Sequence, residues 1–121
     1  MPTRRPERLS GLLLHAVAEI LLREVKDPRV RGVTLTGVTV SSDLRTATVF
    51  FRTLRVEEQP AAQAGLQSAT GYIRHQIAGR LRLRHIPTLS FRYDATLDKA
   101  TRLESLLRQA KEMSSGREEE P

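Results

Sequence analysis

The residues of this chain that could carry binding chemistry are mostly arginines, and they gather in a stretch without acidic residues. Between Gln59 and Tyr93 the sequence contains no aspartate or glutamate. The basic residues of that stretch are Arg74, Arg80, Arg82, Arg84 and Arg92. Arginine presents a planar fork of N–H donors that suits phosphate oxygens. A block of one sign of charge predicts a polyanionic partner, with a solvated basic face as the alternative.

The charge of the whole chain points in the same direction. The 121-residue sequence carries a formal net charge of +6. Segment 111–121 holds two basic residues and four glutamates, so the positive excess belongs to the rest of the chain. Aromatic residues make up only 4% of the sequence, which argues against base stacking on exposed rings as the main means of holding a nucleic acid.

Most of these arginines are expected on a helix from Ala61 to about Leu83. Apolar residues recur there at steps of three and four, which indicates the buried face of a helix. That face consists of Leu66, Ala69, Ile73, Ile77 and Leu81. Arg74 and Arg82 then share one row of the helix surface, and Arg80 and Arg84 form the neighbouring row. We predict a band that follows a phosphate backbone; arginine stems covering apolar surface are the alternative.

Three more residues are candidates for phosphate contact. Arg45 begins the second predicted strand, and Arg92 lies in the third. His75 lies close to the arginine band, although a partly exposed helix histidine is the favoured interpretation there.

Catalytic chemistry finds little support in the sequence. The histidines His15, His75 and His85 show no metal-ligand spacing among themselves. The chain has no cysteine, and therefore no thiol nucleophile or thiolate site. Asp27, Asp43 and Asp94 each lie beside a turn or a helix end, where aspartate commonly bonds its own backbone. We therefore predict no enzyme activity, no metal and no cofactor.

The elements that position these residues indicate an α+β domain. The sequence predicts a helix from Pro6 to about Val25, a hairpin of strands Gly32 to Ser42 and Arg45 to Leu54, and a third strand from Thr88 to Asp94. A last helix is expected from Asp94 or Thr96 to about Met113, with Leu97, Ala100, Leu103, Leu107 and Ala110 on its apolar face. Gly37 interrupts the alternation of the first strand, which is typical of a β-bulge.

Domain boundaries follow from these elements. We predict one domain over 1–110 and a flexible charged tail over 111–121. No segment approaches the roughly 20 apolar residues that span a membrane, and the N-terminal apolar run is too short for a signal peptide. A cytoplasmic monomer is the expectation.

Gly71 lies inside the long predicted helix, where glycine costs about 1 kcal/mol relative to alanine. We therefore predict a kink at Ala69-Thr70-Gly71 in place of a straight helix. The expected order is α-β-β-α-kink-α-β-α, with a three-stranded sheet packed by helices.

Four short blocks of the sequence, in order and at matching spacing, give the chain a likeness to a known family. The blocks are Glu24-Val25-Lys26-Asp27-Pro28-Arg29-Val30, then Val38-Thr39-Val40-Ser41-Ser42-Asp43-Leu44 leading into Ala47-Thr48-Val49, then Ala69-Thr70-Gly71-Tyr72-Ile73-Arg74, and finally Leu83 to Asp94. With these blocks the chain resembles the ribosome-binding factor A family over roughly Arg5 to Leu107.

The resemblance implies a type II KH-like fold in which an Ala-x-Gly kink, here Ala69-Thr70-Gly71, replaces the usual glycine loop. It implies a non-catalytic assembly factor that binds the free small (30S) ribosomal subunit, contacts its 16S rRNA and supports late rRNA maturation, with importance in the cold. Release with the help of an assembly GTPase is implied for some organisms. The candidate residues named above would then contact RNA.

Two other functions are weighed against RNA binding. The chain could act as a protein-interaction adaptor, holding a ribosomal protein or an assembly GTPase through an exposed strand edge or the last helix. A nuclease or other rRNA-processing enzyme is the third possibility, and no residues in the sequence support it.

Overall fold

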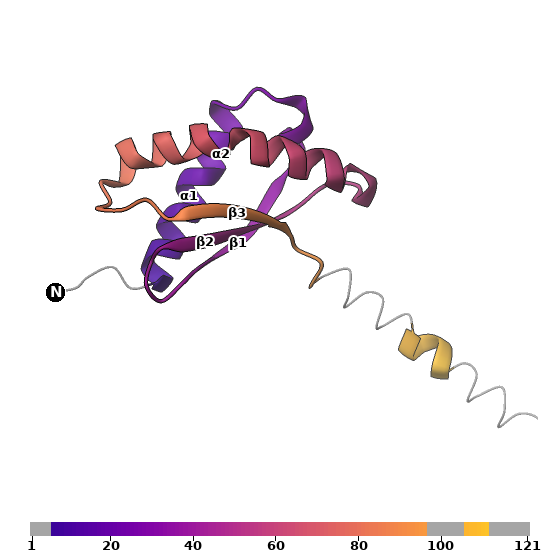
Figure 1. The fold of residues 1–121 in the computed structure, drawn as a ribbon. Helices are drawn as coiled ribbons and strands as arrows, with labels where there is room; N and C mark the ends of the chain where they lie inside the picture. The colour runs from indigo at the N-terminus through magenta and orange to yellow at the C-terminus, as the bar shows by residue number, and fades with distance from the viewer. Residues whose placement is uncertain (1–5, 97–105, 112–121) are drawn as a thin grey trace, which may run out of the picture.

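The computed structural model describes residues 6–96 and 106–111. Within these ranges a three-stranded sheet packs against two long helices (Figure 1). The elements are α1 (Pro6–Arg23), β1 (Thr34–Val40), β2 (Thr46–Arg52), α2 (Gln59–Leu81) and β3 (Thr88–Tyr93), with short 3-10 turns at Pro28–Val30 and Val56–Glu58. The predicted helix, hairpin, helix and third strand are all present, with bounds that differ by a few residues.

The sheet has the order β1-β2-β3. β1 and β2 form an antiparallel hairpin, whereas β2 and β3 run parallel. Parallel neighbours need a crossover connection, and α2 supplies it. The core lies between the helices and one face of the sheet. Its fully buried members include Leu13, Val17 and Ile20 of α1, Val49 and Phe51 of β2, and Leu66, Ile73 and Ile77 of α2.

The bulge expected at Gly37 is confirmed. The pairing of β1 with β2 shifts between Leu35 and Gly37, which leaves Thr36 as the extra residue. Thr36 uses its hydroxyl to donate a hydrogen bond of 2.7 Å to Asp94 Oδ2, just after β3. The irregular strand is therefore tied to the far edge of the sheet.

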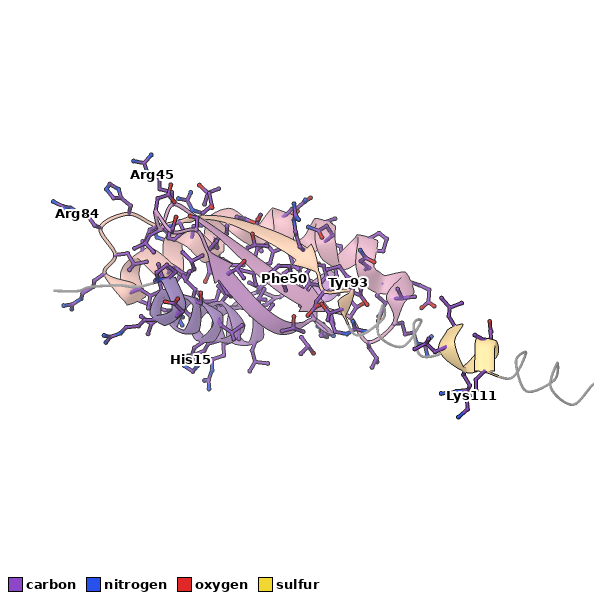
Figure 2. The ribbon with its side chains drawn as sticks, turned by 90° about the horizontal axis from the view of Figure 1, so that it is seen from below. His15, Arg45, Phe50, Arg84, Tyr93 and Lys111 are labelled. Carbon is purple, nitrogen blue, oxygen red and sulfur yellow. The ribbon has the colours of Figure 1, made fainter. Side chains whose placement is uncertain are left out.

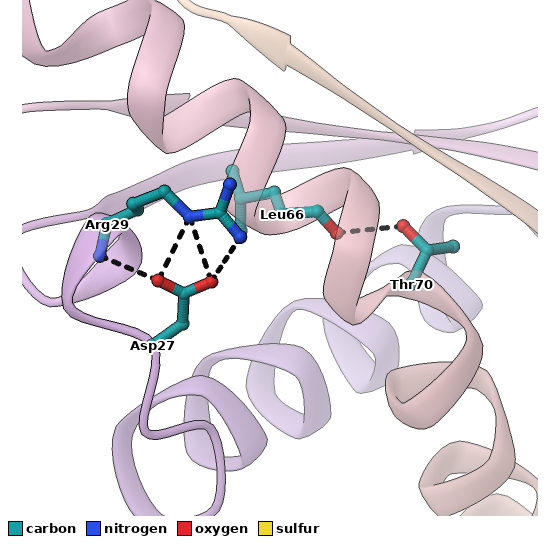
Figure 3. Close-up of polar contacts among 4 residues, drawn as sticks. All are labelled: Asp27, Arg29, Leu66 and Thr70. Carbon is teal, nitrogen blue, oxygen red and sulfur yellow. Dashed lines mark hydrogen bonds and ion pairs between the residues drawn. The ribbon is translucent and has the colours of Figure 1, made fainter.

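The division of the long helix into two is not seen. α2 is one continuous helix of 23 residues that passes through Ala69, Thr70 and Gly71. The Thr70 hydroxyl donates to the Leu66 carbonyl at 2.9 Å (Figure 3), a contact that bends helices without breaking them. A Cβ added at Gly71 would meet nothing within 4 Å, so packing does not require glycine there.

Packing does require glycine at Gly65. A Cβ at that position would lie 2.8 Å from Val30 Cγ1 and 3.0 Å from Arg29 Cβ. The missing side chain lets α2 approach the turn Pro28–Val30 closely. This turn belongs to the first of the family-like sequence blocks, so Gly65 fixes where that block meets α2.

The last predicted helix lies largely outside the described residues. Residues 106–111 are helical. Leu107, which was predicted on the apolar face of that helix, is 61% exposed.

Candidate nucleic-acid interface

Arginines from two separate segments meet at one end of the molecule. Figure 2 shows Arg45, in the β1–β2 turn, and Arg84, in the loop after α2, projecting into solvent at the same end. The two segments are joined because the Thr88 N–H donates to the Arg45 carbonyl at 2.8 Å. We call Arg45, Arg82, Arg84 and His85 the arginine-rich end; all four residues are exposed.

A hollow of about 340 Å³ lies within the arginine-rich end. Its apolar lining comes from Leu9, Leu44 and Leu83, and its polar lining from Asp43, Arg45, Arg84 and His85. A lining that combines apolar side chains with two arginines suits a polyanion with apolar parts, such as a nucleic acid strand.

The turn that carries Arg45 is held by local hydrogen bonds. Leu44 adopts a left-handed backbone with φ 62°. Asp43 Oδ1 accepts from the Ser41 hydroxyl at 2.6 Å and from the Arg45 N–H at 3.0 Å. The Ser41 bond, followed by the Arg45 N–H, lowers the pKa of Asp43 below its ordinary value. The Asp43 carboxylate thus stays charged and serves the turn.

Arg82 and Arg84 do not continue the helical band that was predicted. α2 ends at Leu81, and Arg82 takes the left-handed conformation at φ 49° as its C-cap. A left-handed cap turns the chain away from the helix axis. Arg82 and Arg84 therefore belong to the loop beside Arg45, and the two-row band of four arginines is wrong as a geometry.

The Arg74 side chain, on α2, contacts the same loop. Its Nε donates to the Pro87 carbonyl at 3.2 Å and its Nη2 to the Ile86 carbonyl at 3.0 Å. The residue is half-buried. Because Nε and Nη2 both donate to carbonyls of this loop, Arg74 acts as a brace for the segment that carries Arg82 and Arg84.

Arg80 belongs to a different cluster. Its guanidinium pairs with Glu24 Oε2, and the Tyr72 hydroxyl donates to Glu24 Oε1 at 2.8 Å. The hydrogen bond to the Glu24 carboxylate raises the pKa of Tyr72. This cluster joins the sequence block that begins at Glu24 to the block around Gly71. Glu24 and Tyr72 were not predicted as functional residues from the sequence, although both lie inside the family-like blocks.

The two remaining candidates lie apart from the arginine-rich end. His75 is exposed on α2. Arg92 is exposed on β3, where its register partner on β2 is Phe50. It lies four residues along the strand from Thr88, a separation of roughly 13 Å at the usual rise. Contacts at these positions would need a ligand that extends over the sheet or along α2.

The three aspartates bond their own backbone, as predicted. Asp27 Oδ1 accepts from the Arg29 N–H at 2.9 Å, and its carboxylate also holds the Arg29 side chain (Figure 3). Asp94 Oδ1 accepts from the Thr96 N–H at 2.9 Å. The side-chain bond from Arg29 lowers the pKa of Asp27, and the bond from Thr36 lowers the pKa of Asp94 to about 2. Groups so acidic are unsuited to general acid–base work near neutral pH.

Residues 6–96 and 106–111 hold no group of three or more His, Cys, Asp or Glu side chains that could bind a metal ion. No helix in those ranges is long and apolar enough to cross a membrane.

Comparison with known proteins identifies relatives over nearly the whole chain. A family model described as ribosome-binding factor A matches residues 5–107. The ribosome-binding factor A of Thermodesulfovibrio yellowstonii is 42% identical, with 93% of this chain and 96% of that protein covered. The ribosome-binding factor A of Halothermothrix orenii is 41% identical, with 99% of each chain covered.

Solved structures show the same likeness. The crystal structure of ribosome-binding factor A from Thermus thermophilus superposes with a TM-score of 0.66 at 29% identity, covering 74% of this chain and 97% of that one. A model of the Thermus protein fitted into a cryo-EM map of a 30S–RbfA complex gives 0.61 at 30% identity, covering 72% and 92%. These neighbours confirm the α+β, KH-like fold expected from the sequence.

Proposed function

Since the chain belongs to the ribosome-binding factor A family, we propose that it binds the free small ribosomal subunit and supports late maturation of its 16S rRNA. The family match and the 30S complex of the Thermus relative support a 30S partner. Contact with 16S rRNA, assistance in its maturation and importance in the cold are parts of the proposal.

The observation that carries the proposal is the arginine-rich end. Arg45 and Arg84 bring exposed guanidinium groups from two segments to one end of the molecule, and the exposed Arg82 precedes Arg84 in the same loop. Asp43, the acidic residue of the hollow, is bonded to its own turn. Fixed positive charge on an ordered surface favours phosphate binding, because each neutralised phosphate releases counterions.

The proposed binding is non-catalytic and needs neither metal nor cofactor. The carboxylates of Asp27, Asp43 and Asp94 serve turns, which leaves them poorly suited to activating a nucleophile. We further propose that the protein is a cytoplasmic monomer and that it leaves the subunit as the subunit matures, with the help of an assembly GTPase.

Sedimentation of tagged protein with cell ribosomes tests the proposal. We expect the protein to co-sediment with free small subunits and to be absent from complete ribosomes. A distribution that follows complete ribosomes, or protein that stays at the top of the gradient at low salt, would contradict it.

A further inference from the structure

A second hollow lies at the other end of α1 from the arginine-rich end. Leu9, near the start of α1, lines the hollow of the arginine-rich end, whereas residues from Ala18 onward line this one. It has a volume of about 440 Å³ and runs from the C-terminal half of α1 to the first residues of β1. We call it the α1–β1 groove.

The lining of the α1–β1 groove is mainly aliphatic. Its apolar members are Ala18, Leu21, Leu22, Val25, Val30, Val33 and Leu35. Leu22 is 82% exposed. One exposed leucine is ordinary on a protein surface, but this leucine extends an apolar hollow outward. None of the lining residues is aromatic, so the groove offers no ring on which a nucleic acid base could stack.

The groove ends at an open edge of the sheet. In the order β1-β2-β3, β1 has a partner strand on one side only among residues 6–96 and 106–111. The backbone N–H and C=O groups of its other side can therefore pair with an added strand. Leu35 belongs to this edge strand and also lines the groove. Alternate side chains of an added strand would point towards the groove. The bulge at Thr36 interrupts the strand after Leu35, so an added strand beside the groove would pair with the first residues of β1.

The rim of the groove is positively charged. Arg23, Lys26 and Arg31 contribute to its lining. Arg23 has a loose, exposed contact of 3.8 Å with Glu19. Lys26 and Arg31 form no ion pair within the described part of the chain. Asp27 also lines the groove, but its carboxylate is held by Arg29. The rim therefore favours an acidic ligand.

We propose that the α1–β1 groove binds an acidic segment of a partner protein in extended conformation. The segment would pair its backbone with the free edge of β1 and place alternate apolar side chains in the groove, while its carboxylates face Lys26 and Arg31. The free strand edge and the aliphatic lining favour a peptide over RNA. This binding goes beyond rRNA contact and does not depend on it, since the arginine-rich end lies at the opposite end of α1.

The test uses the full chain and a short fluorescein-labelled peptide in which glutamate alternates with valine. Fluorescence anisotropy should show saturable binding that weakens about tenfold or more in Leu22→Glu. Leu54→Glu is the matched control, because Leu54 is 86% exposed and lies outside the groove; it should bind like the wild type. A peptide methylated on alternate backbone nitrogens should bind much more weakly.

Leu22→Glu should still bind protein-free small-subunit RNA as the wild type does, which separates this proposal from the RNA function. Three results would overturn the proposal: no binding of the glutamate–valine peptide by the wild type, equal affinity in Leu22→Glu and the wild type, or undiminished binding of the methylated peptide. Competition from a short single-stranded RNA whose own binding is lost in Leu22→Glu would assign the groove to nucleic acid and overturn it as well.

Discussion

The Tyr72 hydroxyl donates a hydrogen bond of 2.8 Å to Glu24, a residue 48 positions earlier in the chain. Glu24 also pairs with Arg80, which lies eight residues after Tyr72 on α2. The cluster ties the end of α1 to the centre of α2, close to Gly71. Two sequence blocks that give the chain its family likeness are thus one structural unit.

The Tyr72–Glu24 contact predicts how Tyr72 titrates. Loss of the hydroxyl proton would break the hydrogen bond and place two negative charges side by side, so Tyr72 should ionise above its ordinary pKa of 10.0. Ultraviolet absorbance during alkaline titration measures this, with Tyr72→Phe to identify the signal. In Glu24→Gln the titration of Tyr72 should fall back towards 10.0. An unchanged titration in Glu24→Gln would show that the contact is absent in solution.

Gly65 and Gly71 should respond oppositely to alanine. Gly65→Ala places a methyl group against Val30 and Arg29 and should lower the free energy of unfolding by about 1–3 kcal/mol. Gly71→Ala meets open space and should raise it by up to about 1 kcal/mol, the helix preference of alanine over glycine. Urea unfolding compares the two variants.

Gly71→Leu extends this comparison to function. The open space around Gly71 means that the variant should fold normally, so a loss of RNA binding would assign the glycine to a close approach by RNA. Equal subunit binding by Gly71→Leu and the wild type would show that no RNA approaches α2 closely at Gly71.

Arg74 should support RNA binding without contacting phosphate. Arg74→Lys keeps the charge but loses the two-pronged donation to the Ile86 and Pro87 carbonyls. The loop after α2 should then exchange its amide hydrogens faster, and RNA affinity should fall with no change in its dependence on salt. In Arg74→Ala, which also removes the charge, a salt slope lower by about one phosphate contact would place Arg74 at the phosphate backbone after all.

The lowered pKa of Asp94 predicts that the folded protein loses stability in acid. Its pKa is lowered from 3.8 to about 2, chiefly by the hydrogen bond from Thr36. A lowered folded-state pKa stabilises the protein above the unfolded value, and that contribution disappears as pH falls from about 4 to about 2. Asp94→Asn should therefore be less stable than the wild type at pH 7, with a difference that shrinks through this window. A stability difference between Asp94→Asn and the wild type that does not change with pH would contradict the lowered pKa of Asp94.

The features foreseen from the sequence are those with local causes. Asp27, Asp43 and Asp94 bond backbone groups two residues away, a distance that turn chemistry encodes directly. The bulge beside Gly37 follows from one break in a two-residue alternation. Both depend on neighbours in the chain, so the residue types are enough to predict them.

The features that were missed depend on distant partners. Arg74 was assigned to the surface because its acceptors, the carbonyls of Ile86 and Pro87, belong to a loop 12 and 13 residues later. No packing role was predicted for Gly65, because its close contacts, Val30 and Arg29, lie far from it in the sequence. Arg82 ends α2 in a left-handed conformation without the glycine that usually marks such a cap. The helix was therefore predicted to reach about Leu83, whereas it ends at Leu81.

The central claim is that the arginine-rich end binds the RNA of the small subunit, and the salt dependence of binding tests it most directly. Affinity for protein-free small-subunit RNA is measured over a range of salt for the wild type, for Arg45→Ala with Arg84→Ala, and for Lys111→Ala. Lys111 is the control because it lies at the opposite end of the molecule (Figure 2). The double variant should bind more weakly, with a log–log slope lower by about two phosphate contacts, and Lys111→Ala should match the wild type. Equal affinity and slope in the double variant and the wild type would contradict the claim.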